Sequence, residues 1–153
     1  MIPDSIVQLL ETGVSILVGT RDASLMPECT RAWGIQVASR RNAVTILLSE
    51  TFAGKTIDNL RTNGLIAVTC TRPTDHITCQ LKGTVRTITA TTAAEREHCR
   101  KWHREFVAEL KAIGVPEQLP EAWIVEPTLA VEFSVSDIFD QTPGPGAGKK
   151  IGP

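Results

Sequence analysis

Short strand-like segments separated only by turn residues are the feature of this sequence that most limits its possible folds. Residues 29–39 alternate between two phases, the period expected of a strand with one buried face. Arg40, Arg41 and Asn42 leave room only for a tight turn before the next apolar segment. Six segments have this strand character: residues 15–20, 29–39, 43–49, 65–71, 77–88 and 129–139. Because they do not alternate with helices, we predict a mainly β fold, a small six-stranded antiparallel barrel, and not a parallel α/β sheet.

Helical periodicity is confined to three stretches, which we expect to lie at the periphery of the barrel. Residues 4–12 form a short amphipathic segment, and a second begins near residue 52 and stops at Asn63 and Gly64. The longest covers residues 93–113, with its apolar stripe at Cys99, Trp102, Phe106, Leu110 and Ile113. The chain of 153 residues is the length of one domain, which we place at residues 1–140. Residues 141–153 are rich in Gly and Pro and are predicted to form an ordered arm or a flexible tail.

Charge and apolar patterning argue against several classes of partner. The sequence has 16 Lys and Arg against 17 Asp and Glu, whereas nucleic-acid binding proteins usually carry a basic excess. No apolar run approaches the roughly 18 residues of a membrane span, and no secretory signal is recognisable at the first residues. We therefore expect neither a nucleic-acid nor a membrane partner.

The four cysteines, Cys29, Cys70, Cys79 and Cys99, show no Cys-x-x-Cys spacing. A thiol inside a strand-like or helix-like pattern is usually a small buried hydrophobe. We predict that role for all four, in a reducing, cytoplasmic setting.

A cluster of hydroxyl and basic residues marks the start of the second helix. Ser49, Thr51 and Thr56 surround Gly54 and Lys55 where a strand gives way to a helix. A helix N-terminus favours anions, so a docked phosphate would accept from backbone N–H groups, hydroxyls and the ammonium together. The alternative is a solvated lysine beside ordinary capping hydroxyls.

Arg31 is a second candidate for holding an anion. It shares the apolar phase of its strand with Trp33, Ile35 and Val37, and a buried guanidinium needs a partner. The alternative is that it lies at the strand end and reaches water. Together with Lys55 it would make a two-point phosphate clamp.

The other chemically interesting residues give weaker signals. The spacing of His98 and His103 does not suit a metal pair, and a surface or structural role is predicted for them and for His76. No carboxylate pair suggests acid–base catalysis. We predict no metal site and nominate no catalytic residue. The tryptophans are expected in the core: Trp33, Trp102 and Trp123.

The order of elements and the segment LLSETFAGKTIDNLRTNGLIAV at residues 47–68 resemble the pyridoxamine 5′-phosphate oxidase-like family of FMN-binding split β-barrels. The resemblance covers about residues 5 to 140 and depends on the order of several short motifs. It implies a split barrel and an FMN site at a homodimer interface. It also assigns seven residues to the cofactor: Arg31, Ala32, Trp33, Ser49, Lys55, Thr56 and Thr78.

The resemblance places four of these residues at the phosphate end of the cofactor. Arg31 matches the strand arginine that faces the phosphate, and Ser49 matches a position beside the phosphate and ribityl chain. Lys55 and Thr56 match the pair that grips the phosphate. The family often has two basic residues there, so Thr56 departs from the pattern.

The resemblance places the other three residues near the flavin ring. Ala32 and Trp33 match positions where backbone groups approach the ring, and Thr78 matches a polar strand position that reaches the flavin from the partner subunit.

The resemblance leaves several functions open. The vitamin B6 oxidases close with a segment rich in Arg and aromatic residues, whereas residues 139–153 here read FDQTPGPGAGKKIGP, so pyridoxamine phosphate is not the expected substrate. The leading hypothesis is an FMN-dependent oxidoreductase that acts as a homodimer on an unknown small substrate or electron donor. Alternatives on the same barrel are a non-catalytic flavin- or haem-binding protein, an F420-binding protein, and an interaction module without a cofactor.

Overall fold

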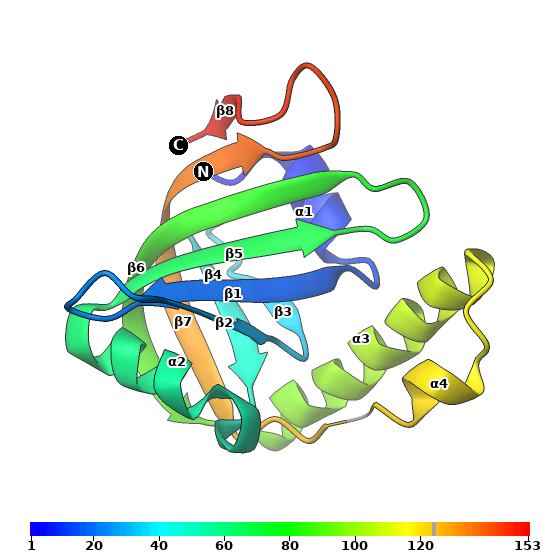
Figure 1. Ribbon diagram of the computed structural model, residues 1–153, viewed down its shortest axis with the longest axis horizontal. Helices are drawn as coiled ribbons and strands as arrows, with labels where there is room; N and C mark the ends of the chain where they lie inside the picture. Colours follow the sequence, from blue (N-terminus) through cyan, green and yellow to red (C-terminus); the bar gives the residue numbers. More distant parts are fainter. Residues whose placement is uncertain (124) are drawn as a thin grey trace.

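The computed structural model describes residues 1–123 and 125–153, and the described residues form a strongly curled sheet with helices outside it (Figure 1). Within them the elements follow in the order α1 (Asp4–Leu10), β1 (Ser15–Arg21), β2 (Pro27–Arg31), β3 (Ile35–Val37), β4 (Ala43–Leu48), α2 (Glu50–Asn63), β5 (Leu65–Thr71), β6 (Thr78–Ala90), α3 (Ala93–Ala112), α4 (Gln118–Glu121), β7 (Leu129–Asp140) and β8 (Lys150–Gly152).

The strands make one antiparallel sheet in the order β2-β1-β5-β6-β7-β4-β3, with β8 paired to β7. The two edge strands, β2 and β3, are consecutive in the chain, and residues 32–34 connect them. The Ala32 N–H donates to the Ile16 carbonyl of β1 at 3.1 Å, and the Trp33 N–H donates to the Leu47 carbonyl of β4 at 2.8 Å. This short connection therefore holds the two ends of the curled sheet together and makes it a split barrel.

Every second side chain of the strands points into the barrel, as the period of two predicts. In β1 the buried phase faces the core and the other phase faces outward. Fully buried side chains from five strands fill the interior: Ile16, Val18, Ile46, Val68, Leu81, Phe133 and Ile138.

The strands β6 and β7 approach each other closely at Gly83. A Cβ atom there would lie 1.9 Å from the Ser134 carbonyl oxygen, and the register of the two strands shifts between Lys82 and Gly83. The bulge or close approach predicted from this glycine is confirmed.

The long helix α3 is attached to the barrel near the start of β1. The Trp102 indole N–H donates to the Val14 carbonyl at 3.0 Å, and both groups are buried. A Cβ at Gly13 would lie 2.2 Å from the Glu105 carbonyl carbon, so the chain before β1 touches the helix backbone directly. In Figure 1, α2 and α3 lie along the same side of the sheet, at its two ends. Among the described residues, no helix is both long and apolar enough to cross a bilayer.

The mainly β split-barrel prediction is confirmed, but the strand count differs. The expected strand over residues 29–39 is wrong as a single element, because residues 32–34 leave the strand to bond β1 and β4. Residues 141–153 contribute β8, so the described residues contain eight strands instead of six. The helix α4 is an additional element, outside the three predicted helical stretches.

Candidate functional site

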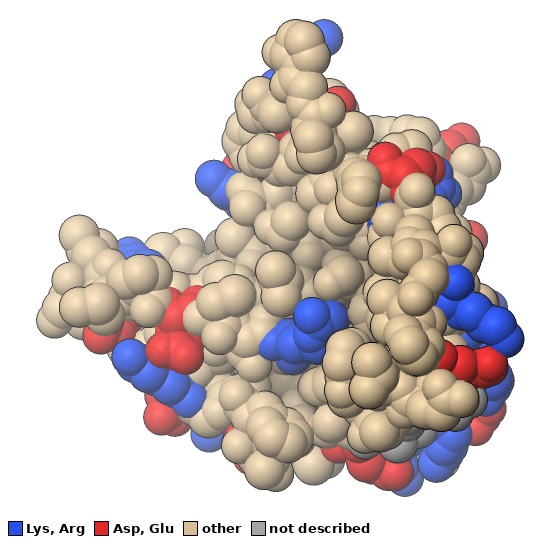
Figure 2. Space-filling view, turned by 45° about the vertical axis from the view of Figure 1, so that its right-hand side comes forward, with Lys and Arg blue, Asp and Glu red and all other residues tan. Residues whose placement is uncertain are grey.

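Two adjoining cavities lie beside α3, where the end of β2 meets the helix. They share Arg31, Phe106 and Trp123. The smaller, of about 270 Å³, adds Trp33 and His103. The larger, of about 410 Å³, is bounded also by Ser15, Thr71, Pro73, His76, Leu110, Ile113 and Val115. Figure 2 brings the side of α3 and α4 forward: most charged groups lie around its margin, and much of the middle is uncharged.

Arg31 is held in the wall of both cavities by its place on β2. It is the register partner of Leu17 on β1, so it lies on the outward face of the sheet. Its Nη1 donates to the Ser15 hydroxyl at 3.3 Å, and its guanidinium carbon lies 5.8 Å from the centre of the Phe106 ring. Within the part of the chain that the structure describes, these contacts include no carboxylate. A half-buried guanidinium without an acidic partner is suited to binding an anion.

Besides Arg31, aromatic side chains line the smaller cavity: Trp33, His103, Phe106 and Trp123. Trp102 packs edge-on against Trp33, with 6.4 Å between ring centres, and stacks on Phe106 at 5.2 Å. The Trp33 indole N–H is buried and finds no hydrogen-bond partner among the residues that the structure describes. The arrangement offers flat apolar walls beside one positive group, which suits a planar ligand that carries an anion.

The core prediction for tryptophan holds at Trp102 and is wrong at Trp123, of which 50% is exposed. Trp123 lies just after the end of α4 and lines both cavities beside α3. Phe106 was predicted only as part of an apolar stripe. The sequence carried no signal that it would face Arg31, because 75 positions separate the two residues along the chain.

Ser49, Lys55 and Thr56 form a second cluster at the start of α2. The Ser49 carbonyl accepts from the Phe52 and Ala53 N–H groups at 3.1 and 3.0 Å, while its side chain makes no capping bond. The Lys55 ammonium pairs with Glu28 of β2 at 3.3 Å. The Thr56 hydroxyl is buried and has no hydrogen-bond partner among the described residues. The cluster therefore has two buried hydroxyl residues and one cation that is already paired.

The structure does not bring Arg31 and Lys55 into one cavity. Thr30 and Glu28 face α2, since the Thr30 hydroxyl donates to the Phe52 carbonyl at 3.3 Å and Glu28 pairs with Lys55. Arg31 follows Thr30 in the strand and points to the opposite face. The two cations therefore flank the edge strand β2, and Lys55 lines neither cavity beside α3.

The other three predicted cofactor residues use polar groups in hydrogen bonds within the protein: Ala32, Trp33 and Thr78. The N–H groups of Ala32 and Trp33 are used to close the barrel. The Thr78 hydroxyl donates to the Thr71 hydroxyl at 3.0 Å, and Thr71 lines the larger cavity. Thr78 itself lies on a different hollow, beside α1. The cofactor roles of all seven residues stay predictions.

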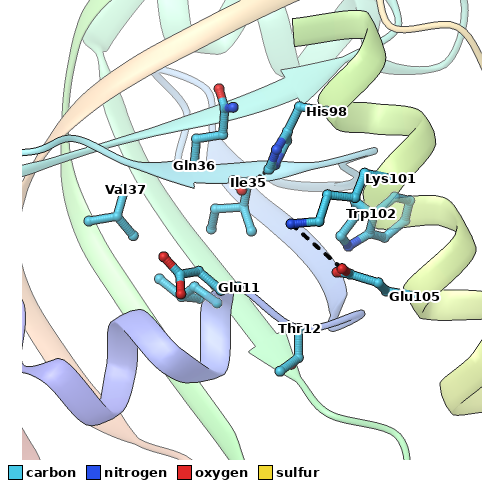
Figure 3. Close-up of a pocket in the computed structure, with 10 residues that line it drawn as sticks. Glu11, Thr12, Ile35, Gln36, Val37, His98, Lys101, Trp102 and Glu105 are labelled. Carbon is cyan, nitrogen blue, oxygen red and sulfur yellow. Dashed lines mark hydrogen bonds and ion pairs between the residues drawn. The ribbon is translucent and has the colours of Figure 1, made fainter. Parts of the chain in front are cut away.

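A third, more polar hollow of about 470 Å³ lies between the end of α1, β3 and α3 (Figure 3). Its floor includes Ile35 and Trp102, and its rim carries an ion pair of 3.8 Å between Lys101 and Glu105. The His98 Nε2 lies 2.8 Å from the Ile35 carbonyl. None of the seven predicted cofactor residues lines this hollow.

The described residues form no metal-binding cluster, and most of the cysteines are buried. The residues described contain no group of three or more His, Cys, Asp or Glu side chains arranged to hold a metal ion. Cys70, Cys79 and Cys99 are buried, as predicted, but Cys29 is exposed on β2 and that part of the prediction is wrong. Burial raises the pKa of the Cys99 thiol from 9.0 to about 11, so this thiol stays protonated at neutral pH.

The chain was compared with known proteins. No protein-family model matches the sequence, and no curated protein matches it. Among solved structures, HupZ of Group A Streptococcus has a TM-score of 0.61 at 19% identity, covering 97% of this chain and 100% of HupZ. An F420 reductase has a TM-score of 0.58 at 11% identity, covering 90% and 98% of the two chains.

A third solved structure carries the name that the sequence resemblance implied. It is a pyridoxamine 5′-phosphate oxidase-related, FMN-binding protein from Nostoc punctiforme, with a TM-score of 0.56 at 12% identity. The alignment covers 100% of this chain and 98% of that one. The chain therefore has the split-barrel fold of the pyridoxamine 5′-phosphate oxidase-like proteins, which confirms the predicted fold.

Proposed function

We propose that this split barrel binds FMN and acts, as a homodimer, as an FMN-dependent oxidoreductase on a small substrate. The observation that carries the proposal is the half-buried Arg31, which has no recorded carboxylate partner among the described residues and lies in the wall of two aromatic cavities. FMN is a planar aromatic ring system joined to a phosphate. Its ring system would pack against the aromatic walls, and its phosphate would bind the Arg31 guanidinium.

In the homodimer, the residues at the start of α2 of one subunit would complete the phosphate site that contains Arg31 of the other, because the two groups share no cavity within one subunit. The Thr56 and Ser49 hydroxyls make no recorded side-chain bond, so they can turn to a phosphate oxygen without losing a partner. Lys55 must exchange Glu28 for the phosphate. Because both side chains of that ion pair are partly exposed, the pair contributes only about 0–1 kcal/mol to the free energy of folding. Breaking it to bind a phosphate would therefore cost little.

The reaction chemistry would come from the flavin, which supplies hydride or single-electron transfer when bound. The chain's own part would be to hold the anionic end, to place the ring against aromatic walls and to keep water from one side of it. Trp33 and Phe106 would supply those walls. No side chain is assigned as a general acid or base.

The homodimer is supported by apolar groups on the outer face of the sheet. Leu17 of β1 and Leu65 of β5 are 43% and 42% exposed. Pairing of two such faces across a two-fold axis would remove both from water. A partner subunit could then bring Thr78 to the flavin, as the resemblance implies.

An absorbance spectrum of the purified protein tests the cofactor. Flavin bands that bleach on addition of NAD(P)H support the proposal, and a colourless protein that takes up no FMN on titration contradicts it. A Soret band would instead indicate haem, for which His103 and His76 in the cavity walls are candidate ligands. Preferential binding of F420 over FMN would favour the deazaflavin alternative, which the similarity to an F420 reductase keeps in view.

A further inference from the structure

Two cysteines face each other inside the barrel and have no part in the proposed cofactor site. Cys70 of β5 and Cys79 of β6 are register partners, and both side chains are almost completely buried. Neither is in a disulfide. The two strands are joined by a short turn, so the cysteines lie close in the chain as well as in space.

The hydrogen bonds of the turn define the geometry of this pair. The Arg72 N–H donates to the Ile77 carbonyl at 3.0 Å, which makes these residues a hydrogen-bonded pair of the hairpin. Pairs of this kind recur at every second position, so Cys70 and Cys79 form the next one. Cα atoms in such a pair are about 5.5 Å apart, within the range of roughly 4.4–6.8 Å that a disulfide spans. The Cβ atoms of such a pair lie toward the wide end of about 4.5–5.5 Å, whereas a disulfide holds them at roughly 3.5–4.5 Å. A bridge therefore requires the two strands to move together by about an ångström at this position, without a change of register.

The Cys79 thiol also affects the protonation of Cys70. The hydrogen bond with Cys79, followed by burial, raises the pKa of the Cys70 thiol well above its ordinary value of 9.0. A protonated, buried thiol reacts slowly, because the thiolate is the reactive form. Oxidation would therefore proceed through opening of the hairpin end, whose turn residues 74–77 are exposed.

We propose that Cys70 and Cys79 are a redox modification site, at which two-electron oxidation forms a cross-strand disulfide that thiol reductants reopen. With hydrogen peroxide as the oxidant, two S–H bonds and the O–O bond break, one S–S bond forms, and two water molecules leave. The bridge would fix the two strands at the root of the turn that carries Pro73 and His76, both of which line the larger cavity. The proposal does not depend on which cofactor, if any, occupies that cavity.

The chain offers a direct assay by mass spectrometry. Trypsin cuts after Arg61 and Lys82 but not at the Arg72–Pro73 bond, so residues 62–82 form one peptide that contains both cysteines. The full chain with Cys29→Ser, which removes the exposed thiol, is treated with hydrogen peroxide under native conditions. We expect loss of two of its three thiols, a peptide lighter by two hydrogens, and full recovery of both thiols with dithiothreitol.

Two controls make the result decisive. Cys29→Ser/Cys79→Ala keeps the interior apolar and should lose no thiol pair. The parent Cys29→Ser protein is also oxidised in urea, where the strands are separated. If the native peptide keeps both thiols and the bridge forms only in urea, or if either cysteine is oxidised to sulfinic acid without a bridge, the proposal is wrong.

Discussion

Replacing Arg31 by Ala is the most direct perturbation of the proposed flavin site. A hydrogen bond between a guanidinium and a phosphate contributes about 1.5–3 kcal/mol, so FMN affinity should fall about 10- to 150-fold at roughly 1.4 kcal/mol for each factor of ten. Folding should change much less. Arg31 makes one long bond to Ser15 and one contact with the Phe106 ring, together about 1 kcal/mol.

Quenching of FMN fluorescence on titration measures the affinity, and urea unfolding measures the stability of the same samples. Arg31→Lys keeps the charge but not the planar fork, so it should bind FMN with an intermediate affinity. Arg86→Ala is a matched control, because Arg86 is also a strand arginine but pairs with Glu132 away from both cavities. If Arg31→Ala binds FMN as tightly as the Arg86→Ala control, the cavity beside α3 is not the phosphate site.

Three further predictions concern the second cluster, the dimer and the barrel. Lys55→Ala should weaken FMN binding by about 1–2 kcal/mol with no loss of folding stability, because its pair with Glu28 is exposed; unchanged affinity would remove Lys55 from the site. Leu17→Lys should convert a dimer to monomers in sedimentation velocity, whereas Leu119→Lys, on α4, should not. Gly83→Ala should cost about 3 kcal/mol or more in urea unfolding, since its Cβ would meet the Ser134 carbonyl, and Gly54→Ala, which meets nothing, should cost none.

The fold was largely predictable because its signals are local. The period of two along β5 and the apolar stripe of α3 each depend on neighbours within a few residues. A glycine inside a strand pattern was by itself enough to predict the close approach at Gly83. The break after Arg31 was not predictable, since the N–H groups of Ala32 and Trp33 bond to strands whose position depends on the whole sheet. Alternation continues through residues 32–34 in the sequence although the strand does not.

The site was harder to predict, because its chemistry depends on which face of a strand meets which helix. The sequence identified Arg31 and Lys55 as the two cations of interest but carried no information that Glu28 would pair with one of them. It placed Phe106 correctly in the apolar stripe of the long helix, but it carried no sign that the Arg31 guanidinium would lie over the Phe106 ring. Both contacts join segments that are far apart in the chain, and they depend on where α2 and α3 lie relative to β2.

That placement of the two cations leads to a test of how a dimer would build its sites. Since Arg31 and Lys55 lie on opposite faces of an edge strand, we expect each cofactor to take Arg31 from one subunit and Lys55 from the other. A mixed dimer of Arg31→Ala and Lys55→Ala subunits would then contain one doubly defective site and one fully intact site. FMN titration of that dimer should show half of the sites with normal affinity. If both cations serve a cofactor within one subunit, every site in the mixed dimer carries one defect, and no site of normal affinity will be found.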